Sequence, residues 1–255
     1  MICCIRGSNF FPMVDIHCHI LPGIDDGSES WEMTAEMCRI SAEDGITHIV
    51  ATPHCNDQFP YDRDRYADML GELYDSADGK LSFSLGCDFH LSDDNICDAL
   101  AHPRRYAIGE SQYLLAEFDD YTIAPSRLQD VFSLLSNGMV PIITHPERNP
   151  TLLRRPEMLL AMLEQGCLVQ ITASALTGFW GKPAQNMAEW LLKGEAVHVV
   201  ASDAHDPENR RPALSEARQA IARLAGNDVA EALVTRNPAA IVDGKSLPYQ
   251  PLFHL

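Results

Sequence analysis

Short, almost continuously apolar runs recur along the chain and alternate with stretches of helical periodicity. They cover residues 14–17, 46–52, 81–88, 113–118, 139–144, 167–172 and 196–201. Runs of this kind are too apolar for strands with one solvated face, and they are typical of parallel strands covered by helices. The pattern therefore predicts an α/β fold with about seven strands.

The segments between these runs carry signals for where helices begin and end. In residues 30–44, Met37 and Ile40 share one face, and Gly45 follows as a stop signal. Further helices are expected between Pro125 and Gly138 and near residues 62–76, 156–165, 184–194, 213–225 and 228–236. Because the βα alternation continues without a break in composition, we expect a single barrel-like α/β domain.

Composition and charge exclude several classes of partner. The 36 acidic residues exceed the 19 basic ones, and the resulting net charge of −17 repels nucleic acid phosphates and anionic membrane surfaces. No apolar run reaches the ~18 residues that a membrane-spanning helix needs, and we expect no secretion signal. The eight cysteines are scattered, as small buried hydrophobes would be in a reduced, cytoplasmic protein.

Six of the seven runs end in side chains that can bind a metal ion. These side chains are His17 with His19, His54, Asp88, Glu117, His145, and Asp203 with His205. The carboxyl ends of parallel strands meet at one mouth in α/β barrels, and active sites form there. Alternate side chains of an extended segment point to the same side, so His17 and His19 can reach one ion. Each residue alone could be structural, but their joint placement predicts a metal site.

The chemistry of this set points to phosphoester hydrolysis. Its histidines and acids are too many for one ion and fit two or three, and two-metal sites are suited to phosphoryl displacement. Glu117 supports this, because a carboxylate that ends an apolar strand is costly to bury unless it is paired or metal-bound. Arg148 and Arg210 follow ligand positions and are expected to bind phosphate oxygens. Four other histidines are expected to lie outside the site: His48, His102, His198 and His254.

Five segments of the sequence match a known family. "DIHCHILPGIDDG", "ATPH", "AEF", "THPER" and "SDAHD" occur here in the order found in the PHP (polymerase and histidinol phosphatase) superfamily. The chain most resembles its bacterial protein-tyrosine phosphatase branch, which is associated with capsule and exopolysaccharide synthesis. The likeness runs from Val14 to about Pro212. Asp26 favours this branch, because other PHP members usually have a histidine there.

The resemblance implies a distorted seven-stranded (β/α) barrel of the PHP type that holds two to three divalent ions. Manganese is favoured over iron or zinc. By position, one ion would be held by His17, His19 and Asp203, a second by Glu117 and His145, and a third by Asp26, His54 and His205. Asp88 would bridge the first two ions, and Arg148 and Arg210 would bind the phosphate. Asp15 and Asp25 would support the ligands or belong to the loop, and Cys18 and Cys55 would be structural.

The resemblance also implies a substrate, which is phosphotyrosine in the tail of a bacterial tyrosine kinase that controls polysaccharide synthesis. Two alternatives are a small-molecule phosphatase of the histidinol-phosphate kind and a non-catalytic metal-binding regulator. A regulator needs no phosphate clamp, so Arg148 beside a full ligand set argues against the second alternative.

The sequence departs from the family pattern at two places. Asp88 stands where the family usually has glutamate, which leaves open a shifted bridge or help from the nearby His90. Family chains also tend to begin at the position of Met13. Residues 1–12 are therefore expected to be a poorly ordered extension, and residues 13–255 to form the phosphatase domain.

Overall fold

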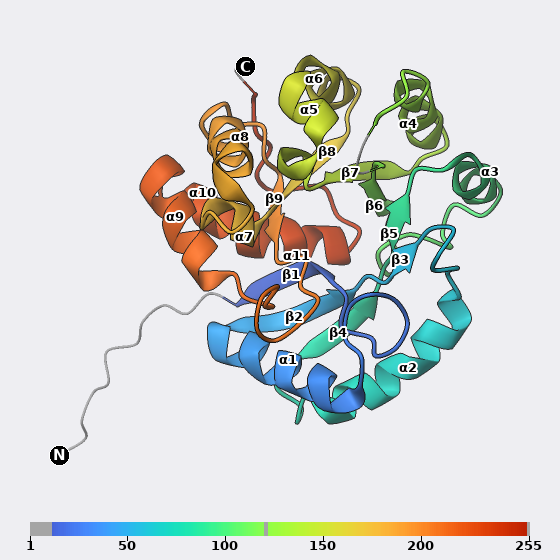
Figure 1. Cartoon of the computed structure of the whole chain (residues 1–255), viewed down its shortest axis with the longest axis vertical. Coiled ribbons are helices and arrows are strands. Elements are labelled where there is room, and N and C mark those ends of the chain that lie inside the picture. Colours follow the sequence, from blue (N-terminus) through green and yellow to red (C-terminus); the bar gives the residue numbers. More distant parts are fainter. Residues whose placement is uncertain (1–11, 120–121, 254–255) are drawn as a thin grey trace.

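Parallel strands form the centre of the fold, and helices surround them (Figure 1). The computed structural model describes residues 12–119 and 122–253. Its strands are β1 (Met13–Cys18), β2 (Ile46–Ala51), β3 (His54–Cys55), β4 (Ser82–Leu85), β5 (Asp88–His90), β6 (Tyr113–Glu117), β7 (Val140–Thr144), β8 (Leu168–Thr172) and β9 (Val199–Ala201). All pairings between them are parallel, which confirms the predicted α/β class.

The strands belong to two sheets, not to one closed seven-stranded barrel. One sheet has the order β1-β2-β4, and the other has the order β3-β5-β6-β7-β8-β9. The prediction of one strand over residues 81–88 is wrong, because this run divides into β4 in one sheet and the start of β5 in the other. The run 196–201 is strand only over its second half, in β9.

The division between the sheets arises where two neighbouring strands are interrupted at the same level. Pro53 lies between β2 and β3 and has no N–H for the ladder. Gly86 lies between β4 and β5, and a Cβ there would be 3.0 Å from Cγ1 of Val50. Because both strands break together, β2 pairs with β4 before the break and β3 pairs with β5 after it.

The end of the first strand meets the end of the last one. Cys18 and Ala204 form an isolated parallel bridge. The backbone N–H of His19 donates to Ala204 at 2.8 Å, and that of Asp203 donates to His17 at 2.8 Å. Segments that are far apart in the sequence are thereby placed side by side, each with two candidate ligands.

Most helices lie where the sequence predicts them. They are α1 (Trp31–Asp44), α2 (Arg63–Ser76), α3 (Asp93–Ala101), α4 (Arg127–Ser136), α5 (Pro150–Arg154), α6 (Glu157–Glu164), α7 (Ala173–Leu176), α8 (Gly181–Lys193), α9 (Ser215–Ala225), α10 (Asn227–Glu231) and α11 (Asn237–Val242). The side chain of Ser30 caps α1, and Gly45 ends it with a φ of 97°. The expected helix 228–236 is instead α10 followed by a π-helix at Ala232–Arg236. The short helices α3, α5, α7 and α11 were not expected.

Two hydrophobic cores hold these layers together. The larger core packs the sheets against the outer helices. The smaller one joins residues of β1, β6, β7 and β9, such as Ile16 and Leu115, to Ile241 in α11. Five of the described cysteines are buried as expected, whereas Cys97 is exposed.

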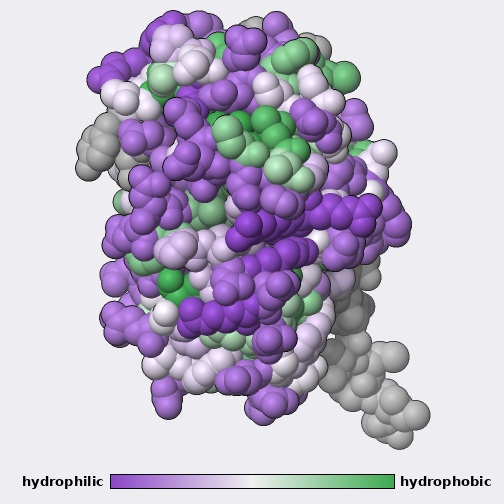
Figure 2. Space-filling model, turned by 90° about the vertical axis from the view of Figure 1, so that its right-hand side faces the viewer, coloured by the Kyte–Doolittle hydropathy of each residue, from purple (hydrophilic) through white to green (hydrophobic). Residues whose placement is uncertain are grey.

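The outer surface is largely polar. Figure 2 shows one face on which hydrophilic residues predominate and hydrophobic atoms gather in a few small areas. In the part of the chain that the structure describes, no helix is both long and apolar enough to cross a membrane. The expectations for residues 1–12 and His254 lie, apart from Pro12, outside the described residues.

Candidate metal centre

His17, His19, Asp88 and Asp203 converge where β1 and β9 end and β5 begins. The Nε2 atoms of His17 and His19 are 3.2 Å apart. Oδ1 of Asp203 lies 3.4 Å from Nε2 of His17 and 3.5 Å from Nε2 of His19. Oδ2 of Asp88 lies 3.5 Å from Nε2 of His17. All four residues are buried, so this group is shielded from water.

A second group forms around Asp26, in the loop that follows β1. Oδ1 of Asp26 is 3.3 Å from Nε2 of His54 and 3.4 Å from Nε2 of His205. The loop reaches this place because it folds back tightly on β1. A Cβ at Gly27 would lie only 2.3 Å from the backbone oxygen of His19, so only glycine fits there.

A third group includes the ends of β6 and β7. Oε1 of Glu117 is 3.4 Å from Nε2 of His145, and its Oε2 is 3.5 Å from Nδ1 of His54. The same Nδ1 of His54 is 3.1 Å from Oδ2 of Asp88. His54 and Asp88 therefore connect the groups into one continuous cluster.

The clusters compact enough to hold an ion differ in part from those that the resemblance implies. Three sets have ligand atoms within 4.8 Å of one another: His19 with Asp26, His54 and His205; His17 with His19 and Asp88; and His54 with Asp88 and Glu117. His19 thus joins the Asp26 group as well as the His17 group. His145 belongs to none of these sets, and its Nε2 lies near Glu117.

The polar atoms of this cluster fit a bound cation. Both carboxylate oxygens of Asp88, Nδ1 of His54 and Nε2 of His205 are buried without a hydrogen-bond partner in the described part of the chain. Leaving such groups unsatisfied costs about 1–3 kcal/mol each, and more for a charged group. A divalent cation with oxygen and imidazole ligands would satisfy these atoms.

The ionisation of the cluster also favours a cation. Burial opposes the charged form of His17, but Asp88 and Asp203 raise its pKa to about 9. Burial would likewise raise the pKa of Asp88, yet His17 and His54 hold it well below its usual range. The carboxyl groups of Asp88 and Asp203 thus remain charged and depend on positive charge nearby. A metal ion supplies that charge without protonating the histidines that would bind it.

The far ring nitrogens of the first two histidines have partners that orient them. Nδ1 of His17 is 2.9 Å from Oε1 of Gln170 in β8, and Nδ1 of His19 is 2.7 Å from Oδ2 of Asp25. These contacts turn both Nε2 atoms toward the centre, as the partners of metal-binding histidines usually do. Gln170 was not singled out from the sequence, although a polar residue in the apolar run "LVQIT" is a usable signal.

Asp15 lies beneath the cluster and does not face it. It accepts hydrogen bonds from the backbone N–H of Ser202 at 3.0 Å and from its hydroxyl at 2.5 Å. Burial raises the pKa of Asp15 to about 6. Asp15 therefore joins β1 to the end of β9, next to the ligands that those strands provide.

Two of the predicted ligands have backbone conformations that are rare for residues with a side chain. His145 has a φ of 33° and Asp203 a φ of 52°, both in the left-handed region. Such conformations persist where the surroundings fix them, and they are common at functional sites. They turn each side chain into the cluster directly after its strand ends.

Arg148 and Arg210 meet on the other side of Asp203. Both guanidinium groups donate to Oδ2 of this carboxylate, Arg210 at 2.6 Å. The ring of Trp180 lies under Arg148, 3.8 Å from its Cζ, and 5.4 Å from that of Arg210. Nε1 of Trp180 donates to the hydroxyl of Ser174 at 2.9 Å. Sequence reasoning missed Trp180, because no spacing in the sequence links it to the arginines.

These side chains line a cavity of about 320 Å³, which we call the metal cavity. Its wall includes Asp26, His54, Glu117, His145, Asp203 and His205 together with Arg148 and Arg210. His90 also reaches this wall, while Phe59 and Phe118 add aromatic surface. The cavity thus combines candidate metal ligands with two permanent positive charges.

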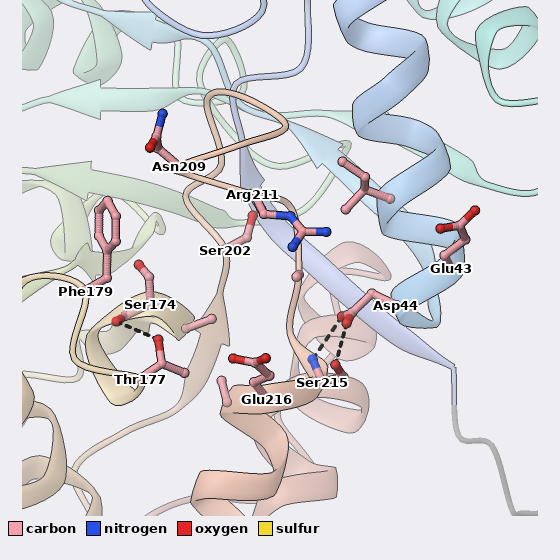
Figure 3. Close-up of a pocket in the computed structure, with 14 residues that line it drawn as sticks. Glu43, Asp44, Ser174, Thr177, Phe179, Ser202, Asn209, Arg211, Ser215 and Glu216 are labelled. Carbon is pink, nitrogen blue, oxygen red and sulfur yellow. Dashed lines mark hydrogen bonds between the residues drawn. The ribbon is translucent and has the colours of Figure 1, made fainter.

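A larger cavity of about 400 Å³ lies behind the same segments (Figure 3). Ser202, Arg211 and Phe179 line it, each one position away from a residue on the metal-cavity side. At its floor, Asp44 caps α9 by accepting hydrogen bonds from the backbone and the hydroxyl of Ser215. Of the residues predicted from the sequence to bind metal or phosphate, none lines this larger cavity.

The parallel α/β fold and the cluster at its strand ends define a metal-dependent hydrolase. A sequence model of the family described as capsular polysaccharide synthesis, CpsB/CapC, matches residues 13–243. The chain therefore belongs to the CpsB/CapC family, and the family resemblance read from the sequence motifs is confirmed.

Two proteins with similar sequences are tyrosine phosphatases. The tyrosine-protein phosphatase YwqE of Bacillus subtilis is 31% identical over 243 residues, covering 94% of this chain and 95% of that protein. The tyrosine-protein phosphatase CpsB of Streptococcus pneumoniae is 28% identical, covering 90% and 98%. A crystal structure from work on these two proteins, described as unique metal-dependent tyrosine phosphatases, superimposes with a TM-score of 0.84 at 30% identity. It covers 94% of this chain and 99% of that chain.

A more distant structure shares only the fold. The histidinol phosphate phosphatase of Lactococcus lactis, solved with zinc, L-histidinol and phosphate, superimposes with a TM-score of 0.56 at 12% identity. It covers 84% of this chain and 94% of that one. This likeness supports the α/β architecture and says nothing about the substrate of this chain.

Proposed function

We propose that this protein is a metal-dependent phosphomonoester hydrolase that removes phosphate from tyrosine side chains of a protein substrate. The observation that carries the proposal is the cluster around the buried Asp88, in which His54 and His205 have unpartnered ring nitrogens and line the same cavity as Arg148 and Arg210. The named relatives support tyrosine as the residue that carries the phosphate. The substrate we favour is the phosphotyrosine tail of a bacterial tyrosine kinase that controls capsule or exopolysaccharide synthesis.

We assign two or three divalent ions to the cluster, with manganese favoured over iron and zinc. The assigned ligands are His17, His19, Asp26, His54, Asp88, Glu117, His145, Asp203 and His205. Bound divalent ions supply Lewis-acid polarisation of water and neutralise charge on the phosphate. The central place of Asp88, within reach of His17 and His54, supports its role as the bridging ligand despite its shorter side chain.

The chain's own residues bind and orient the phosphate. Arg148 and Arg210 present planar, permanently charged donors that match phosphate oxygens in pairs. Asp203 positions them, because its Oδ2 accepts from both guanidinium groups while its Oδ1 faces His17 and His19. This one carboxylate thereby fixes the distance between the phosphate clamp and the ligand cluster.

We also propose that residues 13–255 act as one phosphatase domain and that the protein works in the cytoplasm. Both hydrophobic cores draw residues from β1 and from β7, which supports the first statement. The six described cysteines are all free, which fits a reducing compartment.

The deciding experiment compares substrates with and without metal. Protein loaded with Mn²⁺ should hydrolyse p-nitrophenyl phosphate and a phosphotyrosine peptide, and a chelator should abolish both activities. Activity that survives verified metal removal would overturn the mechanism. A preference for histidinol phosphate over the peptide would move the substrate to a small molecule, and absence of any turnover would leave a metal-binding regulator.

Metal analysis of the same preparation tests the assignment of ions. Two or three ions per chain are expected if Asp88 bridges. A single ion would mean that aspartate at this position does not replace the family's glutamate.

A further inference from the structure

A pocket of about 180 Å³ opens beside the metal cavity, and much of its wall is apolar. Phe118 at the end of β6, Leu152 in α5 and Trp180 before α8 line this Trp180 pocket. Phe118, His145 and Arg148 line both spaces. The two cavities therefore adjoin along a shared wall that contains one side of the phosphate clamp.

The size and lining of the Trp180 pocket suit a single ring. Pockets for drug-sized ligands take about 300–1,000 Å³, so this one has room for one small apolar group only. Phe118 and Trp180 offer aromatic surface, which attracts another ring beyond the effect of area alone. The pocket is thus better suited to an aryl group than to a short polar chain.

The wall that bears Trp180 is held in place before any ligand arrives. The indole stacks 3.8 Å from Cζ of Arg148, and its N–H is bonded to Ser174. Cation–π contact and the hydrogen bond fix the ring from two sides. Because the wall is already ordered, binding of a ring in the pocket costs less conformational entropy, which favours binding.

We propose that the Trp180 pocket receives the phenol ring of the substrate while Arg148 and Arg210 hold its phosphate. This assignment rests on the proposed phosphatase function and adds the structural basis of its preference for aryl esters. Hydrolysis breaks the bond between phosphorus and the ester oxygen, and a water oxygen takes its place on phosphorus. The phenol then leaves with a proton from that water, and the ring departs from the pocket.

The experiment measures kcat/KM for two peptides of the same sequence, one with phosphotyrosine and one with phosphoserine. Trp180→Leu should lower the ratio of the two values by about tenfold. Loss of clamp geometry lowers both rates together, so the ratio isolates the contact with the ring. Trp190→Leu is the matched control, because Trp190 is exposed on α8 and lines neither cavity.

A second variant tests the Trp180 pocket by filling it with a larger side chain, whereas Trp180→Leu removes part of its wall. Leu152→Phe should reduce the same ratio with phosphoserine turnover retained, whereas Leu152→Met, which conserves volume, should keep the wild-type ratio. Circular dichroism of each variant verifies the fold. An unchanged ratio in both Trp180→Leu and Leu152→Phe would overturn the proposal. A ratio that falls only in Phe59→Leu would also overturn it, because Phe59 lines the metal cavity and not the Trp180 pocket.

Binding of unreactive probes separates this inference from the proposed function. Inhibition constants or calorimetry with phenylphosphonate and methylphosphonate should show weaker binding of the phenyl compound in both pocket variants, with methylphosphonate affected less. If wild-type protein binds the phenyl compound preferentially but hydrolyses neither peptide, the phosphatase function fails and the pocket assignment stands. If it hydrolyses both peptides and the phenyl preference does not depend on Trp180 or Leu152, the pocket assignment fails alone.

Discussion

The metal cavity and the larger cavity share a wall, yet their polar side chains differ in whether their hydrogen-bonding atoms have partners. Ser202 and Arg211 face the larger space, and their neighbours Asp203 and Arg210 face the metal cavity. The larger cavity measures about 400 Å³ against about 320 Å³. Volume alone would select the wrong one of the two.

The difference lies in how the polar atoms are satisfied. In the larger cavity, Asp44 accepts hydrogen bonds from the N–H of Leu214 at 2.6 Å and from both N–H and hydroxyl of Ser215. None of its lining side chains has a buried polar atom without a partner among residues 12–119 and 122–253. In the metal cavity, His54 and His205 do have such atoms. Between these two cavities, buried polar atoms without a partner distinguish the candidate site, and volume does not.

The most severe test of this comparison is Asp88→Asn. The amide keeps the shape but removes the charge at the centre of the cluster, so we expect at least about a 1,000-fold loss of kcat/KM, at or beyond the loss from one transition-state donor. Metal analysis should show fewer ions per chain. Wild-type rates with a full complement of metal would contradict the central role of Asp88.

Replacing one arginine should have the next largest effect. Arg148→Ala removes one half of the clamp and should lower kcat/KM by about 100-fold with metal content unchanged. Arg148→Lys restores charge without the planar fork and should recover only part of the rate. Steady-state kinetics at saturating Mn²⁺ provide the measurement, and full recovery with lysine would reduce the role to charge alone.

A smaller change is expected where a residue acts through a ligand. Asp25 orients His19 through the 2.7 Å contact with its Nδ1, so Asp25→Asn should weaken metal binding by about 10- to 100-fold. The half-saturating Mn²⁺ concentration should rise while the maximal rate changes little. An unshifted metal titration would mean that the loop alone holds His19 in place.

A buried histidine outside both cavities extends the comparison to stability. Burial lowers the pKa of His198 to about 4 from 6.5, and its Nδ1 accepts from the N–H of Val169. The unfolded chain therefore takes up the proton first, so stability is lost as the pH falls from about 6.5 toward 4. Between pH 7 and pH 5 this loss amounts to about 2 kcal/mol. Urea unfolding at both pH values should show a loss in His198→Gln that is smaller than the wild-type loss by about this amount.

The smallest effect is expected in the larger cavity. Asp44→Ala removes the cap of α9 and should lower the free energy of unfolding by about 1 kcal/mol, with phosphatase kinetics unchanged. Thermal unfolding and turnover of p-nitrophenyl phosphate measure the two quantities. A marked fall in kcat would show that the shared wall transmits changes between the cavities.

The sequence predicts local features of this fold well and long-range ones poorly. The apolar runs identify most of the strands, and the stop signal Gly45 correctly marks the end of α1, because these signals act within a few residues. The break at Pro53 and Gly86 was missed, since it appears only when two strands are compared side by side.

The same limit applies to the site. Residues that follow apolar runs can be recognised because the ends of parallel strands meet, and most of them lie together in the structure. His54 and Asp88, however, begin β3 and β5 and do not end a strand. Gln170 and Trp180 were missed, because each acts through a partner that is distant in the sequence. The new grouping of His19 with Asp26 likewise depends on how the loop folds over Gly27, which no pattern of spacing reveals.

The contact between the ends of β1 and β9 has a consequence for how the protein is made. His17 and His19 emerge early in synthesis, whereas Asp203 and His205 emerge when most of the chain is complete. A nascent chain that ends before β9 lacks Asp203, which faces His17 and His19. It also lacks His205, which contacts Asp26. Because metal affinity depends on the assembled ligand set, full metal loading has to wait for the last strand. With the proposed ligand set, catalytic competence is thus coupled to the synthesis of β9 and the residues directly after it.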